Sequence, residues 1–200
     1  MKKVFFTCEI CVSALFVTNS FCTESSAEMR INMEHRREKA KELFLDGYNC
    51  SQAVFVAYAD KYGIDKELAL KLSASFGGGM GRMREVCGAV SGMMMVAGME
   101  TGQTKPKDPD AKKANYDMVQ KLARRYKEEY GSIICKELLG LVPMQGQEKK
   151  EAGETEVTAA EFTDTKPEAR TEEYYKKRPC LEQIQKACDI LDEILFTKEQ

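Results

Sequence analysis

One stretch of the chain combines residue types that could together activate a thiol. It runs from Phe76 to Gly92 and contains four glycines in five residues, then two arginines, then Cys87. Positive charge and the start of a helix both lower the pKa of a thiol, and the thiolate is the reactive, metal-binding form. The alternative interpretation is a glycine turn before a buried helix, in which Cys87 is only a small hydrophobic side chain.

Three further cysteines share the expected position of Cys87 at the beginning of a helix. Each follows a residue that commonly begins one: Asn49 precedes Cys50, Ser132 precedes Cys135, and Pro179 precedes Cys180. Free N–H groups and the helix dipole favour an anion at such positions. The four cysteines are far apart in the sequence, so only the fold can assemble them. We predict that Cys50, Cys87, Cys135 and Cys180 converge at one site and act as its catalytic residues or, alternatively, as metal ligands.

Cys188 is predicted to have a different environment. It shares an apolar stripe with Ile184, Leu191 and Leu195 in the last helix, away from the positive end of that helix. We therefore expect it to be a buried core thiol with a raised pKa.

The glycine turn itself is a candidate binding element. Its candidate cofactor-binding residues are Gly77, Gly78, Gly79, Gly81 and Arg82. The guanidinium of Arg82 could hold an anion or support the Cys87 thiolate, or it could be a surface group paired with Glu85. A nucleotide site is not expected, because the turn lacks the Lys-Ser/Thr ending of a phosphate loop and follows a predicted helix.

The hydrophobic pattern predicts an all-α fold, a compact bundle of about seven helices with the glycine-rich turn before the central one. Glycines and capping residues separate segments 33–46, 50–62, 66–75, 86–99, 110–130, 133–139 and 179–196. Segment 86–99 is apolar on nearly all sides, as a central helix would be. The apolar positions include Leu68, Leu70 and Leu72 in the third segment and Tyr116 in the fifth.

Composition narrows the possible function. Thirty basic and 32 acidic residues give a net charge of −2, which is no electrostatic footprint for nucleic acid. The single histidine makes a multi-histidine metal site impossible and a Cys/His zinc finger improbable. Residues 29–200 are predicted to form one helical domain with a polar loop at about 145–172.

The N-terminal tail, residues 1–28, resembles a signal peptide or reflects a start codon placed too far upstream. Two lysines precede an apolar run that is too short for an ordinary membrane span. Cys8 and Cys11 have CxxC spacing, but this is interpreted as incidental. The expected compartment is the cytoplasm, or the exterior if the tail is a cleaved signal peptide.

Five motifs in order resemble the C-GCAxxG-C-C family of redox-active proteins, from about His35 to Leu195. They are Gly47-Tyr-Asn-Cys50-Ser-Gln-Ala, Phe76-Gly-Gly-Gly-Met-Gly-Arg82, Cys87-Gly-Ala-Val-Ser-Gly92, Cys135-Lys-Glu-Leu-Leu-Gly140 and Arg178-Pro-Cys180. The resemblance implies that Cys50, Cys87, Cys135 and Cys180 are the four family cysteines. One departure is that Val86, and not glycine, precedes Cys87. The resemblance implies redox activity without specifying a reaction.

Three functions agree with these features. The first is thiol–disulfide exchange or electron transfer by pairs of the four cysteines, as a possible oxidoreductase with an unknown redox partner protein. The second is an iron–sulfur or zinc module that uses the same four thiolates, although closely spaced cysteine pairs are missing. The third is a helical interaction domain with structural cysteines. The cofactor is therefore none, zinc or an iron–sulfur cluster.

Overall fold

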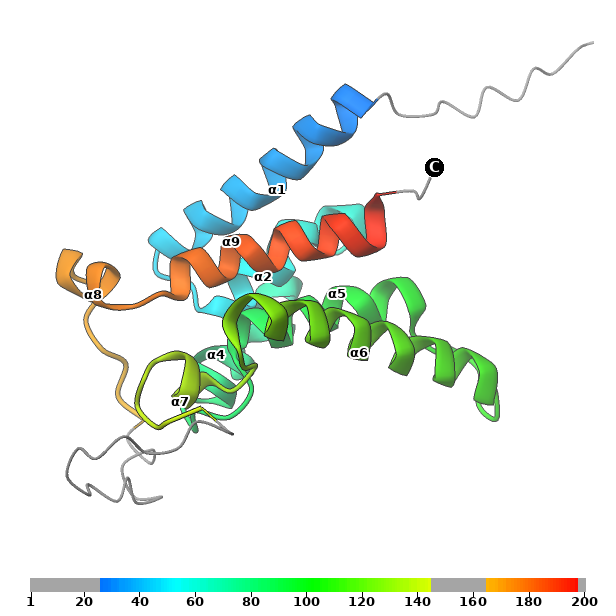
Figure 1. The fold of residues 1–200 in the computed structure, drawn as a ribbon. Helices are drawn as coiled ribbons and strands as arrows, with labels where there is room; N and C mark the ends of the chain where they lie inside the picture. Colours follow the sequence, from blue (N-terminus) through cyan, green and yellow to red (C-terminus); the bar gives the residue numbers. More distant parts are fainter. Residues whose placement is uncertain (1–25, 145–164, 198–200) are drawn as a thin grey trace, which may run out of the picture.

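The structure is a computed structural model that describes residues 26–144 and 165–197 (Figure 1). The predicted all-α fold is confirmed, since helices pack together throughout these two ranges and no strand occurs in them. The predicted signal-like tail lies almost entirely outside the described residues, as does most of the predicted polar loop. The compartment therefore stays a prediction. Among the helices described, none combines the length and the apolar composition needed to cross a bilayer.

The helices alternate with short turns and 3-10 segments. They are α1 (Ser26–Leu45), α2 (Cys50–Ala59), α3 (Lys66–Ser73), α4 (Gly77–Met80), α5 (Gly88–Thr101), α6 (Pro109–Tyr130), α7 (Cys135–Leu138), α8 (Glu172–Lys177) and α9 (Cys180–Leu191). Two 3-10 segments, Asp60–Tyr62 and Ala74–Phe76, extend α2 and α3, and a π-helical turn, Asp192–Phe196, extends α9. The sequence pattern did not predict α8, a short charged helix directly before α9.

The centre of the bundle is α2 with α5 beside it. Eight of the ten residues of α2 are buried, because α1, α3, α5 and α9 surround it. Two glycines of α5, Gly88 and Gly92, allow the two helices to approach closely. A Cβ on Gly88 would lie 3.0 Å from the Cβ of Cys50, and one on Gly92 would lie 2.9 Å from the carbonyl oxygen of Ser51. Any larger side chain at these positions would push α5 away from α2.

Some of the apolar positions in the sequence pattern are not buried. Leu68 and Leu72 of α3 are about half exposed, and the buried residues of this helix are Ala69 and Ser73. Small residues suffice there because Ser73 accepts a hydrogen bond through its carbonyl from the buried Ser51 hydroxyl, which brings α3 close to α2. Tyr116 is also exposed, since α6 contacts the bundle through its C-terminal half, where Leu122 and Tyr126 are buried.

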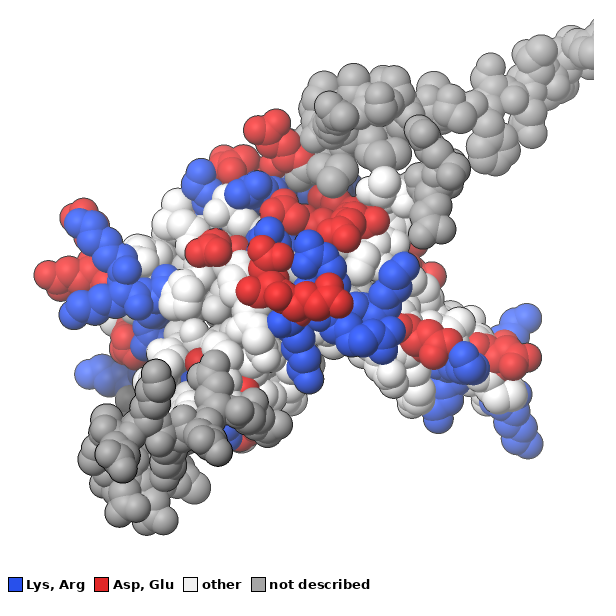
Figure 2. All heavy atoms as spheres, viewed as in Figure 1, with Lys and Arg blue, Asp and Glu red and all other residues white. Residues whose placement is uncertain are grey.

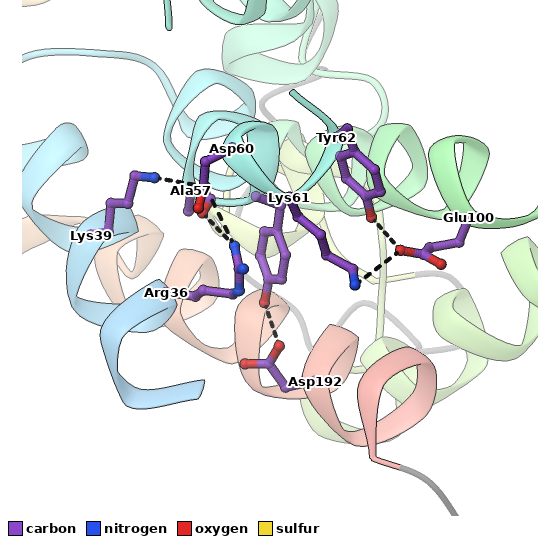
Figure 3. A network of polar contacts seen from close by, with 9 residues as sticks. Arg36, Lys39, Ala57, Asp60, Lys61, Tyr62, Glu100 and Asp192 are labelled. Carbon is purple, nitrogen blue, oxygen red and sulfur yellow. Dashed lines mark hydrogen bonds and ion pairs between the residues drawn. The ribbon is translucent and has the colours of Figure 1, made fainter. Parts of the chain in front are cut away.

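A polar network fastens the end of α2 that is remote from Cys50 (Figure 3). Arg36 of α1 donates to the carbonyl of Ala57, 3.0 Å away, and the Tyr58 hydroxyl donates to the buried carboxylate of Asp192, 3.0 Å away. Lys39 binds Asp60, and Lys61 and Tyr62 both contact Glu100 of α5. These contacts join α1, α2, α5 and the π-helical turn at one end of the bundle.

Charged side chains of both signs are interspersed over the face shown in Figure 2. Several form pairs along or between helices, such as Lys113 with Asp117 on α6 and Lys186 of α9 with Glu129 of α6. Such exposed pairs contribute little to stability. The core and the polar network are therefore what hold the bundle together.

Candidate functional site

The four cysteines singled out from the sequence line one cavity of about 280 Å³. It lies where α2, α5, α7 and α9 begin, at the end of the bundle where α4, α7 and α8 gather in Figure 1. The glycine turn and the segment 165–178 supply the remaining walls. The fold thus brings together cysteines from four separate parts of the chain.

The start of α2 fixes Cys50 by a capping box. The Asn49 side chain accepts hydrogen bonds from the N–H groups of Ser51 and Gln52, and the Gln52 side chain accepts one from the Asn49 N–H. Asn49 also donates to the carbonyl of Ala74, which ties the cap to the end of α3. Cys50 is therefore the first residue of a well-capped helix, as predicted. Cys180 is likewise the first residue of α9, directly after Pro179.

Cys87 and Cys135 are held side by side by backbone hydrogen bonds. The Cys87 N–H donates to Ile133, 2.8 Å away, and the Cys135 N–H donates to Glu85, 2.6 Å away. The two bonds flank an antiparallel bridge between Val86 and Ile134.

The start of α7 differs from the prediction because of this bridge. Its cap is Ile134, whose extended backbone belongs to the bridge, and not Ser132. Ser132 still contributes, since its hydroxyl accepts from the Ile134 N–H and donates to Glu137. The α7 helix is only four residues long, so its dipole gives Cys135 little help.

The glycine turn brings the backbone close to Cys135 and to Asn49, the residue that caps the helix of Cys50. A Cβ on Gly77 would overlap the side chain of Asn49, and one on Gly79 would lie 2.7 Å from the Cβ of Cys135. Gly79 also has a positive φ of 72°, which favours glycine. The predicted binding residues Gly77, Gly78, Gly81 and Arg82 line the cavity, whereas Gly79 packs behind Cys135. A cofactor-binding role for this turn stays a prediction.

Cys50 and Cys180 line the same cavity, and their interaction shifts the pKa values of the two thiols in opposite directions. The hydrogen bond from Cys50 lowers the pKa of Cys180 to about 7, against the effect of burial, and the guanidinium groups of Arg178, Arg170 and Arg84 act in the same direction. The same hydrogen bond raises the pKa of Cys50 well above its usual value, and burial adds to this. The directions of these shifts make Cys180 the thiol of the pair that ionises at the lower pH.

The other two cysteines remain protonated at neutral pH. Burial raises the pKa of Cys87 to about 12, although the N–H groups of Ala89 and Val90 at the start of α5 oppose this. Its sulfur lies 4.0 Å from the buried hydroxyl of Tyr126. Burial also raises the pKa of Cys135, against the nearby guanidinium of Arg84. For these two thiols, desolvation raises the pKa by more than the position at a helix start lowers it.

Four arginines and one carboxylate line the same cavity: Arg82, Arg84, Arg170, Arg178 and Glu168. Glu168 binds Arg178 and lies 3.9 Å from Arg84. Glu85, the partner expected for Arg82, forms an ion pair with Lys136 at 3.1 Å. The predicted role of Arg82 at Cys87 stays a prediction, and Arg84 is the arginine of this turn whose charge acts on Cys135 and Cys180.

The cysteines do not meet the requirement of a shared metal centre. Zinc and iron–sulfur clusters need several ligands around one point. Within residues 26–144 and 165–197, no group of three or more histidine, cysteine or carboxylate side chains has that arrangement.

Sequence reasoning missed part of the site. Arg178 is adjacent to the Pro179-Cys180 motif, so its position offered a signal. Arg170 and Tyr174 gave none, because they fall in a polar stretch whose path to the cavity depends on tertiary contacts. Arg170 stacks on the rings of Phe44 and Tyr174, 4.6 and 4.7 Å from their centroids.

Comparison with known proteins gives one match. A family model described as "Putative redox-active protein (C_GCAxxG_C_C)" matches residues 48–194, which include all four cavity cysteines. The chain matches no curated protein and no solved structure.

Proposed function

Because the chain belongs to the C_GCAxxG_C_C family, we propose that it is a thiol–disulfide oxidoreductase in which Cys180 and Cys50 are the exchanging pair. The observation that carries the proposal is that both cysteines line one cavity together with Arg84, Arg170 and Arg178. A thiol whose pKa lies near ambient pH attacks disulfides most effectively. Cys180 meets this condition, with a pKa lowered to about 7.

The reaction follows from the two roles. The Cys180 thiolate attacks one sulfur of a substrate disulfide, which gives a mixed disulfide and releases one substrate thiolate. Cys50 then loses its proton to the released thiolate and attacks the sulfur of Cys180. The products are a Cys50–Cys180 disulfide and the second substrate thiolate. Two electrons pass from the protein dithiol to the substrate disulfide.

Cys87 and Cys135 are the candidates for a second dithiol in the same cavity. Backbone hydrogen bonds keep their segments adjacent, and both thiols are protonated at neutral pH. One of them could attack the Cys50–Cys180 disulfide and transfer it to the second pair. Such a transfer would return Cys50 and Cys180 to the reduced state for another reaction.

The test is to trap the intermediate. Fully reduced Cys50→Ala protein should form a stable mixed disulfide at Cys180 with a neutral small disulfide, and peptide mass spectrometry should locate it there. In the wild type, the adduct should be resolved to a Cys50–Cys180 disulfide. Cys188→Ala is the matched control and should behave as wild type. A Cys50→Ala protein that resolves its adduct as fast as the wild type would refute the assignment of Cys50.

The alkylation rate of Cys180 provides an independent check. In the wild type it should rise with pH to half its maximum near pH 7, because the thiolate is the reacting form. Cys50→Ala should raise this midpoint most, because the Cys50 hydrogen bond contributes most to the lowering, and Arg178→Gln should raise it less. Arg124→Gln, an exposed change on α6, should leave it in place. An unchanged midpoint in both cavity variants would remove this basis for the proposal.

A further inference from the structure

We propose, on the basis of the exchange reaction above, that the substrate is a small disulfide carrying carboxylate groups, bound by Arg170, Arg178 and Arg84 beside Cys180. This narrows the substrate class from disulfides in general to small anionic ones. Three properties of the cavity favour such a substrate: its charge, its hydrogen-bonding groups and its size.

The charge of the cavity wall is strongly unbalanced. Four guanidinium groups line it, and Glu168 is the only acidic residue among the described lining residues. Glu168 binds Arg178 and approaches Arg84, and its side chain remains about half exposed. This contact demonstrates that the two arginines can receive a carboxylate. Because Arg guanidinium pairs well with planar carboxylates, a substrate carboxylate could take the place of Glu168.

Arg170 supplies a further donor that the protein does not use. Its Nη1 atom is buried and has no hydrogen-bond partner among the described residues. Its other terminal nitrogen donates to the carbonyl of Tyr48, 3.3 Å away, and its guanidinium carbon lies over the rings of Phe44 and Tyr174. These contacts hold the guanidinium in place. An unsatisfied buried donor of this kind is costly, and an anionic group of a ligand would satisfy it.

The size and enclosure of the cavity favour a small substrate. A volume of about 280 Å³ lies at the lower end of ligand-binding pockets. Cys180 is only 8% exposed, and Cys87 and Cys135 are also buried. A disulfide in a folded protein surface would have difficulty reaching Cys180, whereas a small molecule can enter. With carboxylates at both ends, such a disulfide would bind to the arginines and present its sulfur atoms to Cys180.

The reaction balances with the protein dithiol as the only reductant. Cys180 attacks the bound disulfide, a carboxylated thiolate leaves, and Cys50 then displaces the second one. The released thiolate takes up the proton that Cys50 loses. One substrate disulfide becomes two thiols, and one protein dithiol becomes a disulfide.

The experiment compares three small disulfides of similar size in a single turnover of fully reduced protein. They are dithiodiglycolate, which is anionic, hydroxyethyl disulfide, which is neutral, and cystamine, which is cationic. Each rate is divided by the rate of the same disulfide with a free model thiol, which removes differences in intrinsic reactivity. We expect dithiodiglycolate to react roughly tenfold faster than hydroxyethyl disulfide, and cystamine to react slowest.

Variants then identify the groups responsible. Arg170→Gln and Arg178→Gln should each reduce the preference for dithiodiglycolate, and Glu168→Gln should increase it by removing the internal competitor. Arg124→Gln, which makes the same change in charge outside the cavity, should leave the preference unchanged. A variant that merely perturbs the fold would slow all three disulfides together, so the ratio of rates remains informative.

The outcomes separate this inference from the proposed function. If all three disulfides react equally well at Cys180, exchange is established and the anionic substrate class is wrong. If the preference exists but is unaffected by Arg170→Gln and Arg178→Gln, the assigned binding groups are wrong. If no disulfide reacts at Cys180, the exchange reaction itself fails.

Discussion

Cys180 and Cys188 belong to one helix, yet their surroundings give them opposite properties. Cys180 is at the start of α9, where Cys50 and three arginines lower its pKa to about 7. Cys188 is two turns further along and completely buried. Burial raises its pKa, and the nearby carboxylates of Asp192 and Asp189 add to this effect. Position along the helix therefore separates a reactive thiol from a structural one.

Replacing Cys188 by alanine should affect stability but not exchange. The side chain is 0% exposed within the core, so its removal leaves a small cavity that should cost about 1 kcal/mol. Urea denaturation measures this loss, and trapping of the Cys180 mixed disulfide measures exchange. In the wild type, Cys188 should also resist alkylation while Cys180 reacts. Loss of exchange in a folded Cys188→Ala protein would mean that the site includes this residue.

The sequence was sufficient to predict which cysteines meet, but not how they ionise. Capping residues and helix periodicity are local features, and they correctly placed Cys50, Cys87 and Cys180 at helix starts. Those local features suggested lowered pKa values at every one of them. The pKa of each thiol depends on desolvation and on arginines from elsewhere in the chain, and tertiary packing determines both. Only at Cys180 do the hydrogen bond and the positive charges lower the pKa by more than burial raises it.

At the scale of the elements, glycines determine how closely the cysteine-bearing helices approach. On α5, Gly92 faces α2, where a Cβ would lie 2.9 Å from the Ser51 carbonyl oxygen and from the Cβ of Val54. Gly98, on the same helix, has no neighbouring atom within 4 Å of the corresponding position. The two glycines have the same helical setting and different surroundings, so they form a matched pair.

The prediction is that alanine has opposite effects at these two positions. Gly92→Ala should destabilise the protein by about 1–3 kcal/mol, because the backbone of α2 cannot move away without cost. Gly98→Ala should stabilise it by about 0.5–1 kcal/mol, since alanine is the better helix former. Thermal and urea unfolding of both variants provide the measurement. A destabilising Gly98→Ala or a neutral Gly92→Ala would contradict the described packing of α5 on α2.

The elements that the sequence did not predict correctly are those defined by tertiary contacts. The leucines are the apolar positions of α3 in the sequence pattern, but the helix packs through Ala69 and Ser73, because close approach to α2 requires small residues. The residue that caps α7 is Ile134 and not the predicted Ser132, because Ile134 has an extended backbone that pairs with Val86. Hydrophobic periodicity shows neither how closely two helices approach nor which backbone segments pair.

At the scale of the whole molecule, the two ends of the bundle have different tasks. One end gathers the cysteines, arginines and glycine turn around the cavity. The other end is closed by the network of Figure 3, in which Tyr58 of α2 donates to Asp192 and also to the carbonyl of Cys188. Asp192 is only 2% exposed. The global stability of the bundle should therefore depend on the protonation of this carboxyl group.

Burial raises the pKa of Asp192 to about 7, although the hydrogen bond from Tyr58 and the charge of Arg36 oppose this, and Asp189 adds to it. In the unfolded chain the same group titrates near its ordinary value of about 4. Between these pH values the folded protein holds a proton that the unfolded chain has lost. Its contribution to stability is therefore complete below about pH 4 and is lost as the pH rises through 7.

Asp192→Asn should remove this dependence. Relative to the variant, the wild type should lose about 1–2 kcal/mol of unfolding free energy between pH 5 and pH 8, a modest part of the limit set by the pKa shift. Urea unfolding at several pH values gives the difference curve, in which the titration of Cys180 and other groups cancels. Asp189→Asn, a half-buried carboxyl on the same helix, is the control and should give a weaker effect of the same sign, because its pKa is also raised by burial. A flat difference curve for Asp192→Asn would mean that Asp192 is ionised throughout, and that Tyr58 and Arg36 stabilise the buried charge fully.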